Sequence, residues 1–217
     1  MRILAVSDIH GSYDDLDAIL SREASCDVLV IGGDLTTLGT EGEAEAAIKH
    51  LQSFGKPVLA VGGNMDPPQI DETFVQLGVS INGRGVVVND VGYFGVSASP
   101  ISPLNTPNEI PEEEIKRRAE TGWKKILDAR WKIFVPHAPP HNTKVDLVSS
   151  GKHVGSTAVR KFIETNQPDV VVCGHIHEAR GMDSIGKTKI INCGLVGRGF
   201  YGMIHIDKTI SVENRQL

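Results

Sequence analysis

The sequence predicts an α/β fold built on parallel strands with helices packed against them. Short β-branched runs alternate with amphipathic stretches through the first third of the chain, in the order strand, helix, strand, helix, strand. Several apolar runs end in glycine or serine followed directly by Asp or Asn. Because ligands of parallel α/β sheets gather beyond the carboxyl ends of the strands, we expect the function to lie in the loops that follow them.

The first third supplies three expected strands and two expected helices. We place the strands at 1–7, 27–33 and 56–63, and the helices at 13–24 and 41–54. Between 78 and 99 the pattern changes to strands without intervening helices, with Asn82-Gly83 and Asn89-Asp90 as turns. The sheet is therefore expected to become antiparallel in this region.

A loop rich in proline, serine and asparagine leads into the second half. A helix is expected from Pro111 to about Ala129, because proline and three glutamates suit a helix N-terminus. A buried strand at 131–135 precedes a polar loop of roughly 20 residues, which is longer than most connections and suggests a functional or lid role. The remaining elements are a helix near 156–166, a strand at 168–173, and short antiparallel strands at 188–194, 201–207 and 209–214.

Composition limits the class of protein. A chain of 217 residues with 40% hydrophobic residues can bury one sizeable core, so we expect a single domain over 1–217. The net charge of -5, without a basic window, predicts no nucleic-acid-binding surface. The N-terminal apolar run is cut off by Asp8, too early for a signal peptide or a membrane span, so we expect a cytoplasmic protein without a membrane partner. The oligomeric state stays open, with a homo-oligomer among the options.

The three cysteines, Cys26, Cys173 and Cys193, are an odd number and form no CxxC pair. In a protein expected to be cytoplasmic, this pattern fits reduced and buried thiols better than disulfides or a zinc knuckle. We therefore expect all three to be structural.

Seven polar residues follow five of the expected strands. They are Asp8, His10, Asp34, Asn64, His137, His175 and His177. Each alone also fits an ordinary turn residue, a hydrogen-bonded interior histidine or a solvated turn. Their joint occurrence favours a metal site, because the strand ends meet at one edge. Residues two apart in an extended chain, such as Asp8 and His10, also project to the same side.

The number of donors indicates more than one ion. Three oxygen donors and four imidazoles are too many for one tetrahedral zinc, and they suit two divalent ions that share a carboxylate. His175 and His177 repeat the spacing of Asp8 and His10, so we expect them to supply one ligand to each metal. Two cations would also let a chain of negative net charge attract an anionic substrate.

These motifs, in this order and at normal spacings, resemble those of calcineurin-like metallophosphoesterases. The matching segments are Asp8-x-His10, Gly33-Asp34, Gly63-Asn64, His137 and Gly174-His175-x-His177. The resemblance covers essentially the whole chain, and the stretches HAPP at 137–140, HVGS at 153–156 and GHIHEARG at 174–181 look like the compact single-domain bacterial and archaeal members. It implies an α/β fold with four layers, an α/β/β/α sandwich with two mixed β-sheets.

The resemblance also implies how the ligands divide. One metal would be held by Asp8, His10 and His177, the other by Asn64, His137 and His175, and Asp34 would bridge the two. Two divalent ions about 3.5–4 Å apart can activate a shared hydroxide for in-line attack on phosphorus. We therefore expect a dinuclear, metal-dependent phosphoesterase with a small-molecule phosphoester as substrate, and we count Asp34 and Asn64 among its catalytic residues.

The chain departs from the family pattern at Met65. Many members carry histidine after the metal-binding asparagine, and a thioether cannot replace its proton donation, which is typically worth about 10²- to 10⁴-fold. Compact members with cysteine or methionine there look like phosphodiesterases, usually tested with manganese. We therefore expect small organic or nucleotide phosphodiesters to be favoured over monoesters. Mn²⁺ is the expected metal in vitro, with Fe, Zn²⁺, Ni²⁺ and Mg²⁺ as alternatives.

Other residues near the motifs are candidates for supporting roles. His141 and His153, in the long loop after His137, are candidates for a replacement acid, and surface histidines without a role are the alternative. Arg180 is a candidate phosphate clamp, with a surface ion pair as the alternative. Asp66 is expected to cap the turn before two prolines, with orientation of a metal-bound water as the alternative.

A second class of function stays open beside the enzyme. A scaffold could keep this fold while losing turnover. Retention of every expected ligand favours the enzyme, whereas the absence of histidine at Met65 leaves the scaffold in consideration. A protein phosphatase ranks lower, because the chain lacks extra domains and the usual histidine.

Overall fold

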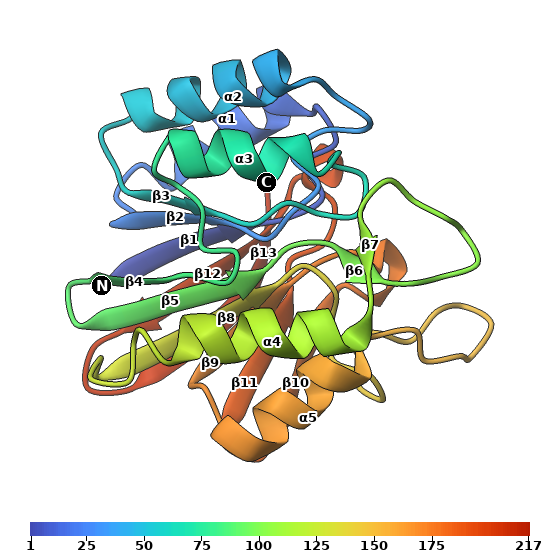
Figure 1. Cartoon of the computed structure of the whole chain (residues 1–217). Helices are drawn as coiled ribbons and strands as arrows, with labels where there is room; N and C mark the ends of the chain where they lie inside the picture. The colour runs from blue at the N-terminus through green and yellow to red at the C-terminus, as the bar shows by residue number, and fades with distance from the viewer.

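Two β-sheets lie face to face between two groups of helices in the computed structural model, which describes residues 1–217. One group is α1 (Tyr13–Arg22), α2 (Glu41–Ser53) and α3 (Gln69–Gln76), and the other is α4 (Glu112–Trp123) and α5 (Thr157–Asn166). Figure 1 shows the first group on the outer face of one sheet and the second group on the outer face of the other. The four-layer α/β/β/α fold is therefore confirmed.

The first sheet combines three parallel strands with two antiparallel ones. Its order is β13 (Ile210–Gln216), β12 (Phe200–Ile206), β1 (Arg2–Val6), β2 (Val28–Ile31) and β3 (Val58–Ala60). β1, β2 and β3 run parallel, as the alternating pattern predicts, and β12 returns antiparallel to β1. The C-terminal hairpin thus closes the sheet on the side away from β3.

Both faces of this sheet are buried, which explains why β1 reads as an unbroken apolar run. Leu4 and Val6 face the core shared with α1, α2 and α3, whereas Ile3 and Ala5 face the core between the two sheets. This alternation is the two-residue period of a strand.

The second sheet is also mixed. Its order is β10 (Gly181–Ile185), β11 (Thr188–Asn192), β9 (Val170–Cys173), β8 (Trp131–Pro136), β5 (Val91–Val96) and β4 (Gly85–Val88). The expected antiparallel hairpin is present as β4 and β5, joined at Asn89-Asp90, where φ is 47° and 64°. The expectation of purely antiparallel C-terminal strands is wrong for β11, which pairs parallel with β9. The chain reverses direction twice between these two strands, because β10 comes between them in sequence and runs antiparallel to β11.

The helices differ from the sequence prediction in two places. The fourth ends at Trp123 instead of near Ala129, because the chain turns there and brings Ile126 and Ala129 into the core beside β5. α3 was not predicted, although its buried residues Ile70 and Phe74 have the i, i+4 spacing of a helix face. Eight residues give too short a periodic signal to stand out between two loops.

The loops contain a few short elements that matter for the site. They are β6 (Ser99–Pro100), paired with β7 (Glu109–Ile110), and the 3₁₀ turns η1 (His177–Ala179) and η2 (Val196–Arg198). The three cysteines are free and buried, as expected. None of the helices has the length and apolar character needed to cross a bilayer.

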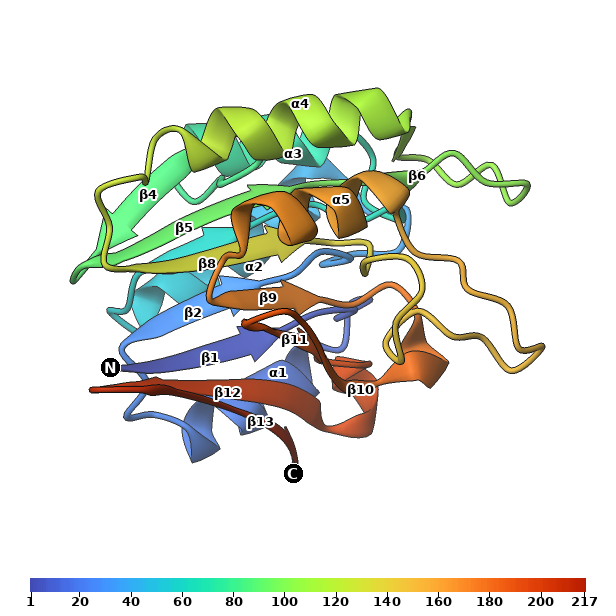
Figure 2. The same ribbon diagram turned by 90° about the horizontal axis from the view of Figure 1, so that it is seen from below.

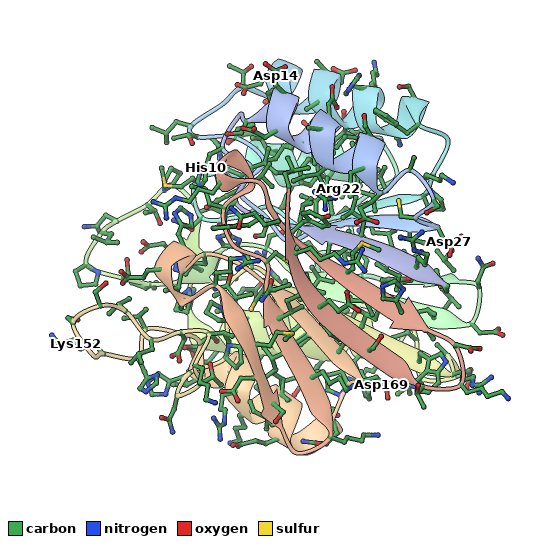
Figure 3. All side chains as sticks on the ribbon, turned by 180° about the vertical axis from the view of Figure 1, so that it is seen from behind. His10, Asp14, Arg22, Asp27, Lys152 and Asp169 are labelled. Carbon is green, nitrogen blue, oxygen red and sulfur yellow. The ribbon has the colours of Figure 1, made fainter.

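The carboxyl ends of β1, β2, β3, β8 and β9 lie at the same end of the molecule, although they come from two different sheets. Figure 2 shows the loops that follow these strands gathered on that side. In Figure 3, His10 and Lys152 lie at this end, while Asp27 and Asp169, which precede β2 and β9, lie at the opposite one. The fold therefore collects the polar strand endings at one place.

Candidate metal centre

Asp8 and His10 follow β1 in a tight turn. Their φ values are 53° and 49°, a left-handed backbone that non-glycine residues adopt rarely and often at functional sites. The expectation that Asp8 and His10 project to the same side because the chain there is extended is therefore wrong, although both side chains do face the same site. The turn is fixed instead by the amides of Ile9 and His10, which both donate to the carbonyl of Asp34, at 2.8 and 2.9 Å.

The Asp34 carboxylate lies between two histidines. Its Oδ2 is 3.5 Å from Nε2 of His10 and 3.4 Å from Nε2 of His137. Its Oδ1 accepts a hydrogen bond from the amide of Met65 at 2.7 Å. Burial acts to raise the pKa of Asp34, but His137 and His10 outweigh it and lower the pKa, which keeps this group an anion.

Asn64 directs one amide oxygen at two imidazoles. Its Oδ1 is 2.9 Å from Nε2 of His137 and 2.7 Å from Nδ1 of His175. The backbone around it is held from outside, because Asn108 bonds to the carbonyls of Gly63 and Asn64. The asparagine therefore ties a loop of the first sheet to histidines from the second.

His137 is fully buried at the end of β8. Its Nδ1 lies 2.8 Å from the carbonyl of Gly32, and a carbonyl can only accept, so Nδ1 carries the proton and Nε2 faces Asp34 and Asn64. Metal-binding histidines are commonly oriented in this way. Burial acts to lower the pKa of His137, but Asp34 outweighs it and raises the pKa to about 9, so a metal would replace a proton on this ring.

His175 and His177 follow β9 with different surroundings. The amide of His175 donates to both oxygens of Asp8, at 3.0 and 3.1 Å, and φ is 67°. Burial and the nearby His137 lower the pKa of the His175 ring to about 4, so that ring is neutral. The His177 side chain is 44% exposed, and its hydrogen bond with Asp8 raises its pKa.

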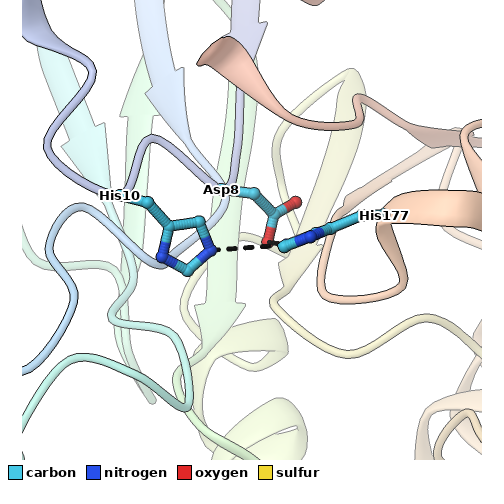
Figure 4. A group of neighbouring side chains, drawn as sticks. All are labelled: Asp8, His10 and His177. Atoms are coloured by element: carbon cyan, nitrogen blue, oxygen red, sulfur yellow. Dashed lines mark hydrogen bonds and ion pairs between the residues drawn. The ribbon is translucent and has the colours of Figure 1, made fainter. Parts of the chain in front are cut away.

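Asp8, His10 and His177 form the outer part of the site (Figure 4). Nε2 of His177 lies 3.4 Å from Oδ1 of Asp8 and 3.3 Å from Nε2 of His10. Nδ1 of His10 lies 2.8 Å from Oγ1 of Thr37, which holds the ring with Nε2 inward. No sequence pattern indicates Thr37, because only the folded loop brings it to the histidine.

The donor set fits divalent cations. The ligand atoms of Asp8, His10 and His177 lie within 4.8 Å of one another, and so do those of Asp8, Asp34 and His137. Both carboxylates are buried, and neither has a lysine or arginine partner. Buried carboxylates facing ring nitrogens are costly without a cation and are typical ligands of one.

Two glycines allow the ligand loops to approach this closely. A Cβ on Gly63 would overlap the carboxylate and the amide nitrogen of Asp34. A Cβ on Gly174 would overlap Ser7 and the Asp8 carboxylate. Glycine is needed at both positions for space.

Asp66 links two of the ligand loops. One carboxylate oxygen accepts from the amides of Leu35 and Gly63, at 3.0 and 2.9 Å, and the other accepts from the amide and hydroxyl of Thr36, at 2.8 and 2.9 Å. The cap expected within its own turn is present, but the bonds to the loop after Asp34 need the three-dimensional fold. Asp66 thus fixes the distance between Asp34 and the Asn64 loop.

The two candidate acids lie in the long loop, outside the cavity that covers the site. Nδ1 of His153 is 2.7 Å from Oδ1 of the buried Asp146, and its ring centroid is 5.9 Å from that of His141. These contacts place His153 within the loop's own packing. A role for either histidine in proton transfer stays a prediction.

Arg180 also lies outside that cavity. Its guanidinium stacks on the ring of Phe200, 4.1 Å from the centroid, and donates to the carbonyl of Arg215 at 2.9 Å. Its place as a phosphate clamp therefore stays a prediction, and it would require the guanidinium to leave these partners.

A cavity of about 510 Å³ opens above the site. Its floor includes His10, Asp34, Asn64, His175 and His177. Its walls come from the segment around β6 and from the long loop after β8. The candidate ligands are thus accessible to a small molecule.

Comparison with known sequences gives one family. The family model described as calcineurin-like phosphoesterase matches residues 1–179. A protein of Methanocaldococcus jannaschii, uncharacterized protein MJ1162, is 34% identical over 196 residues, which covers 88% of this chain and 87% of that protein.

Solved structures share the fold across nearly the whole chain. TT1561 of Thermus thermophilus matches with a TM-score of 0.78 at 18% identity, covering 99% and 98% of the two chains. A dimetal phosphatase from Danio rerio matches at 0.65 and 11% identity, covering 100% and 96%, and a novel archaeal phosphodiesterase at 0.58 and 15%, covering 100% of both chains. At these identities the likeness shows the fold alone.

Proposed function

The chain belongs to the calcineurin-like phosphoesterase family, and from this premise we propose that it hydrolyses phosphodiesters with a pair of divalent metal ions. The observation that carries the proposal is the position of Asp34, whose Oδ2 lies between Nε2 of His10 and Nε2 of His137 at 3.5 and 3.4 Å. One carboxylate at similar distances from two clusters of ligand atoms is the arrangement that a bridging ligand requires.

The proposed ligands divide into two sets around that carboxylate. Asp8, His10 and His177 form one set, and Asn64, His137 and His175 form the other. Bound there, the two ions would supply the positive field that attracts a phosphate group and the Lewis acidity that activates a water. The protein's own contribution is orientation, through the bonds of His137 to Gly32 and of His10 to Thr37.

Two features support diesters over monoesters. Met65 lines the cavity and cannot donate a proton to a leaving group. The cavity also contains no lysine or arginine to share the second negative charge that a monoester carries. The folds of the archaeal phosphodiesterase and the dimetal phosphatase are consistent with this chemistry.

The test combines metal content with turnover. We expect protein reconstituted with Mn²⁺ to bind two ions per chain and to hydrolyse bis(p-nitrophenyl) phosphate faster than p-nitrophenyl phosphate. Asp34→Asn should lower both the second metal's occupancy and turnover, whereas Asp128→Asn, at an exposed turn before β8 and so at the end of that strand opposite to His137, should change neither.

A protein that binds two ions and yet hydrolyses neither ester would contradict the enzyme and favour a scaffold. A single bound ion in an active protein would contradict the two-metal arrangement. Activity with Fe, Zn²⁺, Ni²⁺ or Mg²⁺ in place of Mn²⁺ would change the identity of the metal in this proposal and leave the reaction and the ligands as proposed.

A further inference from the structure

Two loops from distant parts of the chain make the walls of the cavity apolar. These loops contribute six apolar side chains to the lining of the cavity, and none of the six is a candidate ligand: Pro100, Ile101, Pro103, Leu104, Val148 and Val154. Ile101 and Leu104 are 67% and 79% exposed, which is unusual for large aliphatic side chains next to a polar site. Exposed apolar side chains grouped around a functional centre are typical of a binding surface.

The first wall is held in shape by one carboxylate. Glu109 accepts from the amide and hydroxyl of Ser102, both at 2.8 Å, and from the amide and hydroxyl of Thr106, at 2.9 and 2.7 Å. Partial desolvation opposes ionisation, but these bonds outweigh it and lower the pKa of Glu109 to about 2. Ile101 and Leu104 are therefore exposed on a fixed loop.

The second wall has a similar internal anchor. Asp146 accepts from the amides of Asn142, Thr143 and Gly155, at 3.0, 2.8 and 3.0 Å. The amide of Ser149 also donates to Glu178, at 2.8 Å, which ties the loop to the turn after His177. Val148 and Val154 are thus presented by an ordered loop as well.

The cavity offers no fixed positive side chain. Its lining contains no lysine and no arginine, and Arg180 is already bonded to Arg215 and stacked on Phe200. Any phosphate beyond the one at the metal centre would have to leave water without a cationic partner. The walls are therefore unsuited to polyphosphates and suited to an uncharged apolar group.

We propose that this cavity binds an apolar ester group, alkyl or aryl, of a singly charged phosphodiester. The inference rests on the proposed function for the phosphate position and goes beyond it in naming the group that the walls select. Each methylene that leaves water for these walls should improve kcat/KM by up to about fourfold.

The test is a series of p-nitrophenyl alkyl phosphates with methyl, butyl and hexyl groups, and a phenyl member. Water attacks phosphorus and p-nitrophenolate leaves, so leaving group and charge stay constant while only the second ester group changes. We expect kcat/KM to rise by at least about tenfold from methyl to hexyl. Equal values along the series would overturn the proposal, and the proposed hydrolysis would stand.

Matched variants locate the effect. Leu104→Ser should lower kcat/KM for the hexyl ester by about five- to tenfold and for the methyl ester by less than about twofold. Leu127→Ser, which removes an exposed leucine in the turn that follows α4, should leave the whole series unchanged. A uniform loss across all esters in Leu104→Ser would contradict selection by the wall.

Binding gives a readout that does not need turnover. Calorimetry with Mn²⁺-loaded protein should show dibutyl phosphate binding at least about tenfold more tightly than dimethyl phosphate, and Leu104→Ser should remove the difference. If no ester is hydrolysed but this preference is present, the proposed function fails and the cavity assignment stands. Equal binding of the two phosphates would overturn the assignment whether or not the protein is an enzyme.

Discussion

The amide of Met65 donates to Oδ1 of Asp34 at 2.7 Å, while the side chain of Met65 lines the cavity. Position 65 therefore serves the site in two separate ways. Its backbone orients the carboxylate that lies between His10 and His137, and any residue except proline can provide that bond. Its side chain lines the cavity where we propose that the substrate binds, so changing it should alter specificity without disturbing the candidate ligands.

Met65→His should raise the ratio of monoesterase to diesterase activity by at least about tenfold. The new imidazole can protonate the leaving group or stabilise charge on the phosphate, contributions that reach about 10²-fold and more. The ratio is measured with p-nitrophenyl phosphate and its bis ester on Mn²⁺-loaded protein. Met65→Leu, which keeps an apolar side chain, should leave the ratio unchanged, and an unchanged ratio in Met65→His would remove this side chain from the account of specificity.

How the strands end could be predicted from the sequence, but why their side chains converge could not. Asp34 and His137 each follow an apolar run that is visible in the sequence. The structure places them after strands of different sheets, which face each other across the buried layer that contains Ile3 and Val135. Local pattern carries no information about which sheet a strand joins, so the two-sheet arrangement followed only from the family resemblance.

The backbone at the ligands was equally inaccessible to pattern arguments. Asp8, His10, Asp34 and His175 all have positive φ, which sequence periodicity does not reveal for residues other than glycine. The glycines beside them were visible, but their reason is steric: Gly63 and Gly174 leave room for carboxylates from other loops. The candidate ligands were thus visible in the sequence, whereas their geometry depends on contacts between distant segments.

Asp66→Asn should weaken both the fold and metal binding. All four bonds that Asp66 accepts come from N–H or O–H donors, so an amide NH₂ in place of one oxygen leaves two of them without an acceptor. Each unpaired buried group costs about 1–3 kcal/mol. Metal affinity should fall by about 10- to 100-fold, because the loops of Asp34 and Asn64 lose their link.

Urea unfolding and Mn²⁺ titration measure the two effects of Asp66→Asn. Asp128→Asn, at an exposed turn, serves as the control and should change neither. Loss of stability with unchanged metal affinity would mean that Asp66 supports the fold without positioning the ligands.

The metal-free protein should be most stable near pH 6.5. Burial acts to lower the pKa of His137, but Asp34 outweighs it and raises the pKa to about 9. The protonated His137 therefore stabilises the folded protein fully below about pH 6.5, and this stabilisation is lost as the pH rises to about 9. Burial and His137 lower the pKa of His175 to about 4. As the pH falls from about 6.5 to about 4, His175 therefore binds a proton in the unfolded chain but stays neutral in the folded protein. The free energy of unfolding decreases with decreasing pH in this range.

Urea midpoints in chelator from about pH 4.5 to 9 should trace this maximum. His137→Gln should flatten the alkaline side, because the group with the raised pKa is removed. It should leave the acid side sloped but shallower, because burial still lowers the pKa of His175 while the contribution of His137 is lost. Metal-loaded protein should lose most of the alkaline dependence, since the metal replaces the proton on His137. A metal-free stability that rises steadily from about pH 6.5 to 9 is the result that contradicts this assignment.

Gly63→Ala should abolish binding of at least one metal ion. The added Cβ meets both the carboxylate and the backbone nitrogen of Asp34, and backbone cannot move aside cheaply. Gly42→Ala is the matched control, because its Cβ would meet only Oγ1 of Thr40, at 3.8 Å, within α2. That change should stabilise the protein by about 0.5–1 kcal/mol and leave metal content at the wild-type value, measured by atomic emission.

Glu109→Gln should reduce selection for long ester groups without changing turnover of short ones. The glutamate accepts four bonds from Ser102 and Thr106, and three of them reach one oxygen, Oε1. A glutamine amide can keep only part of these hydrogen bonds, so the loop that carries Ile101 and Leu104 should become more mobile. A long ester group would then have to order the loop before it could contact these side chains, which costs conformational entropy.

The ratio of kcat/KM for the hexyl and methyl p-nitrophenyl phosphates measures this loosening, and it should fall by about threefold in Glu109→Gln. Glu113→Gln, in the exposed first turn of α4, removes the same charge without touching the loop and should leave the ratio unchanged. An equal fall in both variants would trace the effect to lost negative charge. An unchanged ratio in both variants would mean that the loop carrying Ile101 and Leu104 keeps its shape without the Glu109 carboxylate, because the pairing of β6 with β7 is enough to hold it.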